Sequence, residues 1–316
     1  MDKILITGGA GFIGSHLAEQ LISKDYKVTV YDIKPNRNKN VNYVFGDIMD
    51  YDRLKCAMEG HKTVCHLAAM VGVTACLMDE NQVYRINLEG TKNVIRACRE
   101  AGVKNLLFTS SSEVYGEGSP VKILDETMEL KPITHYGKSK MYSEWLMKEF
   151  SEESDVKVTV LRYCNIYGIG QRKEFVVSIF IDSILKGRPV KICGTGDQLR
   201  SFTYVDDAVE GTIKALFRDQ TGFEVFNIGS SSNIQIKELA NKILEFTNSG
   251  RIEYVSYEDL DRIKECEILY RIPSIEKARK YLGYADSTTL DKGLAITYDY
   301  YNSINKEDSF QEVMYP

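Results

Sequence analysis

Short apolar runs alternate with helix-like stretches along the first half of the chain. The runs are rich in β-branched, Leu and aromatic residues, as expected for buried strands, and lie at Ile4–Thr7, Val28–Tyr31, Tyr43–Phe45, Thr63–Leu67, Leu106–Ser110 and Val158–Leu161. The stretches between them predict helices at Phe12–Ser23, Tyr51–Met58, Asn81–Ala101 and Tyr136–Phe150. This alternation predicts an α/β fold, a doubly wound parallel sheet with helices on both faces.

The pattern loosens after Tyr163. Helices are predicted near Val176–Lys186 and Ile236–Thr247, and Phe226–Ile228 is typical of a short returning strand. We expect residues 1–163 to form one domain and residues 164–316 to form mainly a smaller C-terminal α/β lobe over the carboxyl edge of the sheet. A segment near residues 200–230 is expected to return to the first domain.

A glycine-rich loop follows the first strand. Gly8, Gly11 and Gly14 have the spacing of a dinucleotide-binding turn, in which the next helix aims its N-terminal amides at a pyrophosphate. Asp32 ends the second strand, where a carboxylate accepts hydrogen bonds from a ribose and repels a 2′-phosphate. These features predict a Rossmann domain that binds NAD rather than NADP. The alternative is a glycine-rich turn without a cofactor.

Composition excludes several classes of protein. With 45 acidic and 40 basic residues, the net charge is -5, which argues against a nucleic-acid partner. The sequence shows neither a secretory leader nor an apolar run long enough to span a membrane. The seven cysteines lack a Cys-x-x-Cys pair and the four histidines lack metal-ligand spacing, so we expect reduced thiols, a cytoplasmic location and no metal.

The spacing Tyr-x-x-x-Lys occurs twice, at Tyr51/Lys55 and at Tyr136/Lys140. Residues four apart share a helix face, so the ammonium of each pair can lie near the phenol. The first pair is interpreted as a coincidence on a surface helix. The second opens the helix after the fifth strand, where a nearby ammonium should lower the pKa of the Tyr136 phenol and make it a base. The alternative is an ordinary tyrosine on a packing helix.

Several motifs, in order along nearly the whole chain, resemble the extended short-chain dehydrogenase/reductase family, especially its nucleotide-sugar epimerases, dehydratases and decarboxylases. They are TGGAGFIGSHL at 7–17, GDI at 46–48, HLAA at 66–69, SSSEVYG at 110–116, YGKSK at 136–140, RSFTYVDD at 200–207 and RIPSIEKARKYLGY at 271–284. The resemblance implies cofactor contacts from Gly8, Gly11, Phe12, Ile13, Gly14, Asp32, Asp47, Ile48, Leu67, Ala68, Ala69, Tyr136 and Lys140.

The resemblance also assigns the catalytic roles. Tyr136 would be the acid/base, with Lys140 as its electrostatic partner, and Ser111 would hold the reacting oxygen. Ser110 is interpreted as a serine of a solvated turn.

Ser112 and Glu113 bear on the reaction type. Glu113 could remove the C5 proton of a 4-keto sugar, orient a hydroxyl or water, or serve only as an ion-pair partner. Many dehydratases carry an acidic Asp before that Glu, and Ser112 is too weak an acid for the same role. Ser-Glu resembles both nucleotide-uronate decarboxylases and GDP-mannose 4,6-dehydratases, although the latter usually take NADP, which fits poorly with Asp32.

Three residues are expected to contact a nucleotide-diphosphate sugar. Asn165, Arg200 and Arg271 match motif residues that, in the family, approach the diphosphate or the sugar. A guanidinium suits this role because it matches phosphate or carboxylate oxygens with two parallel hydrogen bonds. A surface position is the alternative for each arginine. Asp206 and Asp207 are expected to stabilise a loop or cap a helix. The run YGIGQRKEF departs from the family at Gly168–Lys173, in the loop that faces the sugar.

The resemblance implies NAD-dependent oxidation at C4 of a nucleotide sugar, followed by epimerisation or dehydration. A nucleotide-uronate decarboxylase and a C4 dehydrogenase that releases the ketone are alternatives. A non-catalytic NAD-binding regulator is a rival of another class, which the joint presence of Ser111, Tyr136 and Lys140 disfavours. We expect a homodimer through the helices at Asn81–Ala101 and Tyr136–Phe150, unless their apolar faces only cover the sheet.

Overall fold

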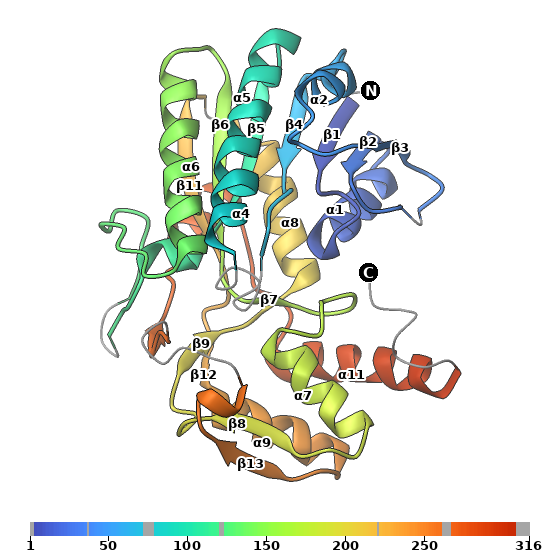
Figure 1. Cartoon of the computed structure of the whole chain (residues 1–316), viewed down its shortest axis with the longest axis vertical. Helices are drawn as coiled ribbons and strands as arrows, with labels where there is room; N and C mark the ends of the chain where they lie inside the picture. Colours follow the sequence, from blue (N-terminus) through green and yellow to red (C-terminus); the bar gives the residue numbers. More distant parts are fainter. Residues whose placement is uncertain are drawn as a thin grey trace.

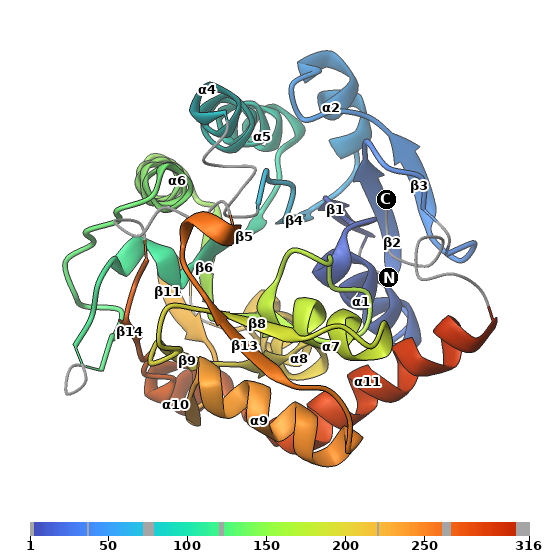
Figure 2. The same ribbon diagram turned by 60° about the horizontal axis from the view of Figure 1, so that its bottom comes forward.

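The structure is a computed structural model that describes residues 3–36, 38–71, 79–119, 123–219, 221–260 and 267–307. Figure 1 shows a larger part built on a parallel sheet and a smaller part beneath it. The C-terminal helix of the smaller part runs below the first helix of the larger part, as Figure 2 shows from below.

The larger part contains the sheet that the apolar runs predict. Its strands are β1 (Lys3–Thr7), β2 (Lys27–Asp32), β3 (Asn42–Phe45), β4 (Thr63–His66), β5 (Asn105–Ser111), β6 (Lys157–Tyr163) and β11 (Phe223–Ile228). Within the described ranges they form one seven-stranded parallel sheet in the order β11-β6-β5-β4-β1-β2-β3. The order reverses between β1 and β4, which is where doubly wound sheets bind their ligands. The predicted fold class is confirmed.

Helices cover both faces of this sheet. Two hydrophobic clusters separate the faces: one contains side chains of α1 and α8, and the other contains side chains of α2, α5 and α6. The bounds are α1 (Phe12–Ser23), α2 (Tyr51–Met58), α5 (Gly90–Ala101), α6 (His135–Glu152) and α8 (Val205–Leu216). A 3₁₀ turn, η2 (Ser112–Tyr115), follows β5 directly.

The single helix expected at Asn81–Ala101 is divided. A short helix α4 (Glu80–Tyr84) leads into a π-helical turn, η1 (Arg85–Glu89), before α5 begins. Asn87 lies within the π turn, and its side chain bonds both the N–H and the C=O of Met70 after β4. Hydrophobic periodicity does not reveal such a turn, because what distinguishes it is the contact between the Asn87 side-chain amide and Met70, a residue distant in the chain.

The smaller part is built from short strands and four helices among its described residues. Its helices are α7 (Val176–Leu185), α9 (Ile236–Thr247), α10 (Glu276–Leu282) and α11 (Leu290–Glu307), with a 3₁₀ turn η3 (Glu258–Leu260). Its strands are β7 (Ile166–Tyr167), β8 (Val190–Cys193), β9 (Leu199–Ser201), β10 (Thr203–Tyr204), β12 (Asn233–Gln235), β13 (Ile252–Val255) and β14 (Tyr270–Arg271). They pair as β10-β7, β12-β9-β14 and β13-β8. Most of these strands have only two or three residues, too few to show an alternating pattern.

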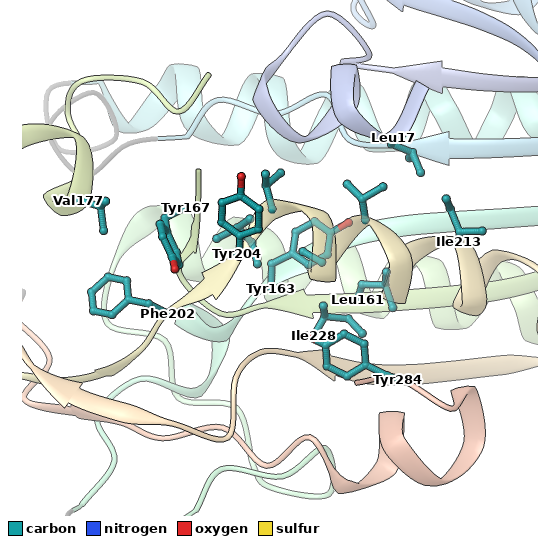
Figure 3. Close-up of a cluster of buried hydrophobic side chains, with 14 of the residues drawn as sticks. Leu17, Leu161, Tyr163, Tyr167, Val177, Phe202, Tyr204, Ile213, Ile228 and Tyr284 are labelled. Carbon is teal, nitrogen blue, oxygen red and sulfur yellow. The ribbon is translucent and has the colours of Figure 1, made fainter. Parts of the chain in front are cut away.

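A shared hydrophobic core joins the two parts. Leu17 and Leu161 of the sheet side belong to the same buried cluster as Val177 and Phe202 of the smaller part. Figure 3 shows Tyr163, Tyr167 and Tyr204 between these groups. Because apolar contact is continuous across the boundary, the smaller part is held firmly over the carboxyl ends of the strands. No described helix is both long enough and apolar enough to cross a membrane.

Candidate active site

The glycine loop packs tightly between β1, α1 and the end of β4. Gly8 has a φ of 72°, and a Cβ there would lie 2.6 Å from the Ala68 nitrogen. A Cβ on Gly14 would overlap the carbonyl oxygen of Gly8. Within this described segment, α1 begins after Gly11 with neither a side-chain cap nor an acidic residue in its first turn. Its first amides, including those of Phe12 and Ile13, therefore suit an anionic pyrophosphate.

Asp32 lies beside this loop, at the carboxyl end of β2. Its Oδ2 accepts the N–H of Ala10 over 2.9 Å, and its Oδ1 accepts the N–H of Lys34 over 2.9 Å. Each carboxylate oxygen can accept more than one hydrogen bond, so both can still receive ribose hydroxyls. The loop and this buried carboxylate together fit NAD.

The other residues predicted to contact the cofactor lie at the same edge. Asp47 and Ile48 follow β3, where the Asp47 carboxylate accepts the N–H of Met49 and its carbonyl accepts the Tyr31 hydroxyl. Leu67, Ala68 and Ala69 follow β4, and the Leu67 N–H donates to Thr7 O over 3.0 Å. Because β1 lies between β2 and β4, these segments flank the glycine loop.

His66 is a buried residue whose importance the sequence pattern did not show. Its Nδ1 lies 2.8 Å from Thr7 Oγ1 and its Nε2 lies 3.1 Å from Thr91 Oγ1. Burial, together with the nearby charge of Lys140, lowers the pKa of His66 to about 3. The imidazole is therefore neutral at physiological pH and ties β4 to β1 and α5.

Lys140 and Tyr136 occupy the first turns of α6, which faces the end of β5. Thr134 caps the helix by accepting the N–H of Gly137 over 2.9 Å. The Lys140 side chain is 3% exposed, and its Nζ donates to Thr109 O over 2.8 Å. The same Nζ lies 6.0 Å from the ring centre of Tyr136. The structure therefore places this ammonium, buried, beside both β5 and the candidate acid/base.

Ser111 ends β5 and caps η2, its Oγ accepting the N–H of Glu113 over 3.2 Å. The turn packs closely on α6, since a Cβ on Gly137 would lie 2.8 Å from the carbonyl oxygen of Glu113. Ser112 is buried against Cys164, which argues against direct contact with a sugar.

The interpretation of Ser110 as a serine of a solvated turn was wrong: it is 3% exposed and donates to Glu144 on α6. No local pattern points to this partner, which lies 34 residues away in the chain.

Glu113 lies between α6 and the smaller part. Its Oε2 accepts the Thr134 hydroxyl over 2.8 Å, and its Oε1 lies 3.5 Å from a terminal nitrogen of Arg271. The ion pair considered from the sequence is thus present. Its partner Thr134 caps α6 and stands two residues before Tyr136 in the chain. A chemical role for Glu113 stays a prediction.

Arg200 and Arg271 are direct neighbours on β9 and β14. The Arg200 guanidinium donates to the carbonyls of Leu199, Ile268 and Leu269 and to Glu267. Burial and the neighbouring charge of Arg271 lower the pKa of Arg200 to about 10. These bonds hold Arg200 in the smaller part, whereas Arg271 reaches Glu113.

Asn165 connects β6 to β7 in the left-handed region, with a φ of 42°. Its Nδ2 donates to Ser201 O over 2.8 Å, which fixes the segment to β9. The structure therefore brings Asn165 to the strand that carries Arg200.

The loop that departs from the family pattern bridges both parts. On α1, His16 Nε2 bonds Ile169 O over 2.8 Å. Arg172 donates to Val71 O, beyond β4. The Gly170 N–H donates to the Tyr301 hydroxyl of α11 over 2.8 Å. The loop thus connects the cofactor side to the C-terminal helix.

Asp206 and Asp207, in the first turn of α8, have structural partners. Asp206 lies 3.6 Å from His16 Nδ1, and Asp207 accepts the N–H and hydroxyl of Thr288. Burial by itself lowers the pKa of His16, but its bonds to Asp206 and Ile169 raise it above the ordinary value.

The described residues contain no group of three or more His, Cys, Asp or Glu side chains suited to a metal ion. Cys56, Cys65, Cys98, Cys164 and Cys193 are free thiols.

Known proteins resemble this chain along most of its length. A model of the NAD dependent epimerase/dehydratase family matches residues 4–229. A UDP-N-acetyl-alpha-D-glucosaminuronate decarboxylase of Bacillus cytotoxicus is 32% identical over 323 residues, covering 96% of this chain and 99% of the relative. A UDP-glucuronate 4-epimerase of Thermodesulfobacterium geofontis is 30% identical over 317 residues, covering 94% and 95%.

Solved structures agree with these relatives. MoeE5 in complex with UDP-glucuronic acid and NAD superposes with a TM-score of 0.89 at 30% identity, covering 96% of this chain and 99% of that chain. The UDP-glucose 4-epimerase of Thermotoga maritima with UDP-glucose gives a TM-score of 0.89 at 31% identity, with the same coverage. The expected family and class of enzyme are confirmed: the chain belongs to the NAD-dependent epimerase/dehydratase family.

Proposed function

We propose that this protein oxidises the C4 hydroxyl of a nucleotide-diphosphate sugar to a 4-keto intermediate, which is then epimerised or dehydrated. The observation that carries the proposal is the buried Lys140 ammonium, bonded to Thr109 O over 2.8 Å and lying beside Tyr136 at the sheet edge that holds the glycine loop. A buried cation next to a phenol favours the phenolate, the form that accepts a proton from a hydroxyl.

The chemistry follows from the side chains at this edge. Tyr136 takes the proton of the C4 hydroxyl, while the buried Lys140 ammonium stabilises the phenolate before the transfer. The Ser111 hydroxyl holds the reacting oxygen in place. The glycine loop would hold the pyrophosphate of NAD and Asp32 its ribose, and the bound cofactor would supply the acceptor for the C4 hydride.

The smaller part supplies the proposed substrate contacts. Asn165, Arg200 and Arg271 lie on or beside β9 and β14. Arg271 reaches Glu113 in the turn after β5. Two neighbouring guanidinium groups suit the two phosphates of a nucleotide diphosphate, or one phosphate and a carboxylate. The bonds that hold Arg200 in place reduce the conformational freedom lost when substrate binds.

Decarboxylation of a nucleotide uronate is the second candidate. The observation that favours it is the contact between Glu113 and Arg271, because Arg271 can exchange that carboxylate for the C6 carboxylate of a uronate. Oxidation at C4 would then make the substrate a β-keto acid, which loses carbon dioxide readily. The names of the decarboxylase and UDP-glucuronate epimerase relatives also support a uronate.

A mass-spectrometric panel separates these reactions. Purified protein is incubated with NAD and a set of nucleotide hexoses and nucleotide uronates, and products are resolved by mass and by chromatography. Loss of water indicates dehydration, and an isomer of unchanged mass indicates epimerisation. Loss of carbon dioxide indicates the second candidate, whereas loss of two hydrogens indicates a dehydrogenase that releases its ketone. If no member of the panel reacts, the proposed C4 oxidation is wrong.

Two further properties are proposed with the function. A homodimer through α4, α5 and α6 is supported by the exposed, adjoining rings of Tyr142 and Trp145 on α6, whose centres lie 5.3 Å apart. Figure 1 shows these helices side by side on the outside of the sheet.

A cytoplasmic location is supported by the free thiols of the described cysteines.

A further inference from the structure

A buried charged network lies directly behind the candidate active site. Glu144 of α6 and Arg162 of β6 form an ion pair with 2.7 Å between Arg162 Nη2 and Glu144 Oε2, and their side chains are 4% and 5% exposed. Ser110 of β5 donates its hydroxyl to Glu144 Oε1 over 2.5 Å. Ser110 and Arg162 are register partners on neighbouring parallel strands, so both side chains face α6.

The network touches both elements that hold the reacting groups. Glu144 is one helical turn beyond Lys140 and shares its helix face. Ser110 stands between Thr109, whose carbonyl accepts the Lys140 ammonium, and Ser111, whose hydroxyl is proposed to hold the substrate oxygen. The Ser110–Glu144 bond therefore fixes the end of β5 relative to α6 at the point where both contribute to the site.

The hydrogen bonds of this ion pair are unusually complete. Arg162 Nε donates to both Glu144 oxygens, over 3.1 and 3.3 Å, and its Nη1 donates to the Tyr115 hydroxyl over 2.8 Å. Tyr115 in turn donates to Asn227 of β11 over 2.8 Å. Burial alone would lower the pKa of Arg162, but its bonds to Glu144 and Tyr115 raise it above the ordinary value.

Stability alone does not account for such a network. Removing two charges from water costs about as much as their attraction returns, so a well-packed apolar pair is often equally stable. What a fully bonded charged pair does provide is one fixed geometry, because any displacement breaks several directional bonds at once. That geometry is needed where a displacement of ~1 Å costs ~100-fold in rate.

We propose that Glu144 and Arg162 are positioning residues that set the distance between the Ser111 hydroxyl and the Tyr136–Lys140 pair, acting through the Ser110 hydroxyl. The inference rests on the proposed function, since it assigns these residues to the same reaction. Neither residue touches substrate or cofactor; each acts on residues that do.

The experiment compares two buried Ser→Ala substitutions that each remove one hydrogen bond on the α6 side of the sheet. Ser110→Ala removes the bond to Glu144. Ser151→Ala, the matched control, removes the bond from α6 to Val156 O, over 3.1 Å and far from the site. We expect Ser110→Ala to lower kcat by roughly 10-fold to 100-fold with KM little changed, and Ser151→Ala to leave kcat within about twofold of wild type. Ser110→Cys retains the size of the side chain with a weaker donor and should fall between them.

A second readout needs no substrate. The ionisation of Tyr136 is followed in the NAD complex as the difference in tyrosinate absorbance between each protein and the same protein carrying Tyr136→Phe. Ser110→Ala should shift this ionisation to higher pH, because loosening the end of β5 displaces Thr109 O, the acceptor that holds the Lys140 ammonium near the phenol. Ser151→Ala should not shift it. Equal kcat and equal ionisation in the two variants would overturn the positioning role.

This readout also separates the two proposals. If wild-type protein transforms no nucleotide sugar but Ser110→Ala still shifts the Tyr136 ionisation, the positioning role stands and the proposed reaction fails. If the panel reacts but the two serine variants behave alike in both measurements, the reaction stands and the positioning role fails. Should Ser110→Ala not fold, Ser110→Cys provides the same comparison.

Discussion

Helices α2 and α6 carry the same Tyr-x-x-x-Lys spacing in opposite surroundings. On α2, the Lys55 side chain is 43% exposed and pairs with Glu100 of α5 over 2.7 Å. On α6, Lys140 is buried and donates to the carbonyl of Thr109 at the end of β5. Desolvation raises the pKa of Tyr51 above its ordinary value, which works against a phenolate there.

The difference shows that location gives this motif its chemistry. An exposed lysine paired with a carboxylate has little charge left to stabilise a phenolate, and water screens what remains. A buried lysine held by a neutral carbonyl keeps its full charge in a medium of low dielectric constant. Of the two helices, only α6 begins against the end of β5, where Ser111 lies.

The largest expected effect comes from removing the phenol of the buried pair. Tyr136→Phe should lower the rate of C4 oxidation by ~10³-fold or more, because it removes the group that accepts the proton, and should leave NAD affinity nearly unchanged. Stopped-flow absorbance of the reduced cofactor and a fluorescence titration with NAD measure the two quantities. A non-catalytic regulator would respond to neither measurement, and a variant with wild-type rate would rule out the assigned acid/base.

A smaller effect is expected in the pH dependence of stability at the buried edge. His66 has a folded-state pKa of about 3, below its ordinary value of 6.5, so the unfolded chain binds its proton first as the pH falls. Its contribution is complete above pH 6.5 and declines below it, by about 1.4 kcal/mol for each pH unit. Urea unfolding at pH 7.5 and 5.5 should therefore show a steeper loss for wild type than for His66→Gln. Parallel losses in the two proteins would mean that His66 does not titrate as the structure implies.

The smallest effect is expected on α2. Tyr51→Phe and Lys55→Met should leave kcat within about twofold of wild type, because Lys55 is exposed and the Tyr51 ring packs under Arg96 of α5, not at the reacting groups. Loss of the exposed pair to Glu100 should change stability only slightly, and less at high salt. Activity assays beside thermal unfolding at low and high salt measure both. A loss of rate comparable to that of Tyr136→Phe would end the distinction between the helices.

The sequence was most informative where residues act locally or in a long pattern. Each of the seven strands of the main sheet coincides with an apolar run, since both faces of a parallel sheet are buried. The glycine loop and Asp32 were recognisable because they follow strand ends at fixed spacing. The structure indeed places them together through the bond from Ala10 to Asp32.

What the sequence could not reveal depends on contacts between distant segments. Ser110 looked like a turn residue because its partner Glu144 lies on α6, 34 residues away, and Arg162 had no local pattern at all. The break in the helix at Asn87 has the same origin, since its partner Met70 follows a different strand. The strands of the smaller part were not predicted because they have only two to four residues, too few to show a period.

The place of β11 at the edge of the main sheet has a consequence for biosynthesis. This strand pairs with β6, but the ribosome makes β7, α7, β8, β9, β10 and α8 before it. Until Ile228 has emerged, the nascent chain exposes the backbone donors and acceptors of β6 along one open side. Such a bare strand invites pairing with other chains, so a fragment cut at Tyr163 should aggregate rather than behave as an independent cofactor-binding unit.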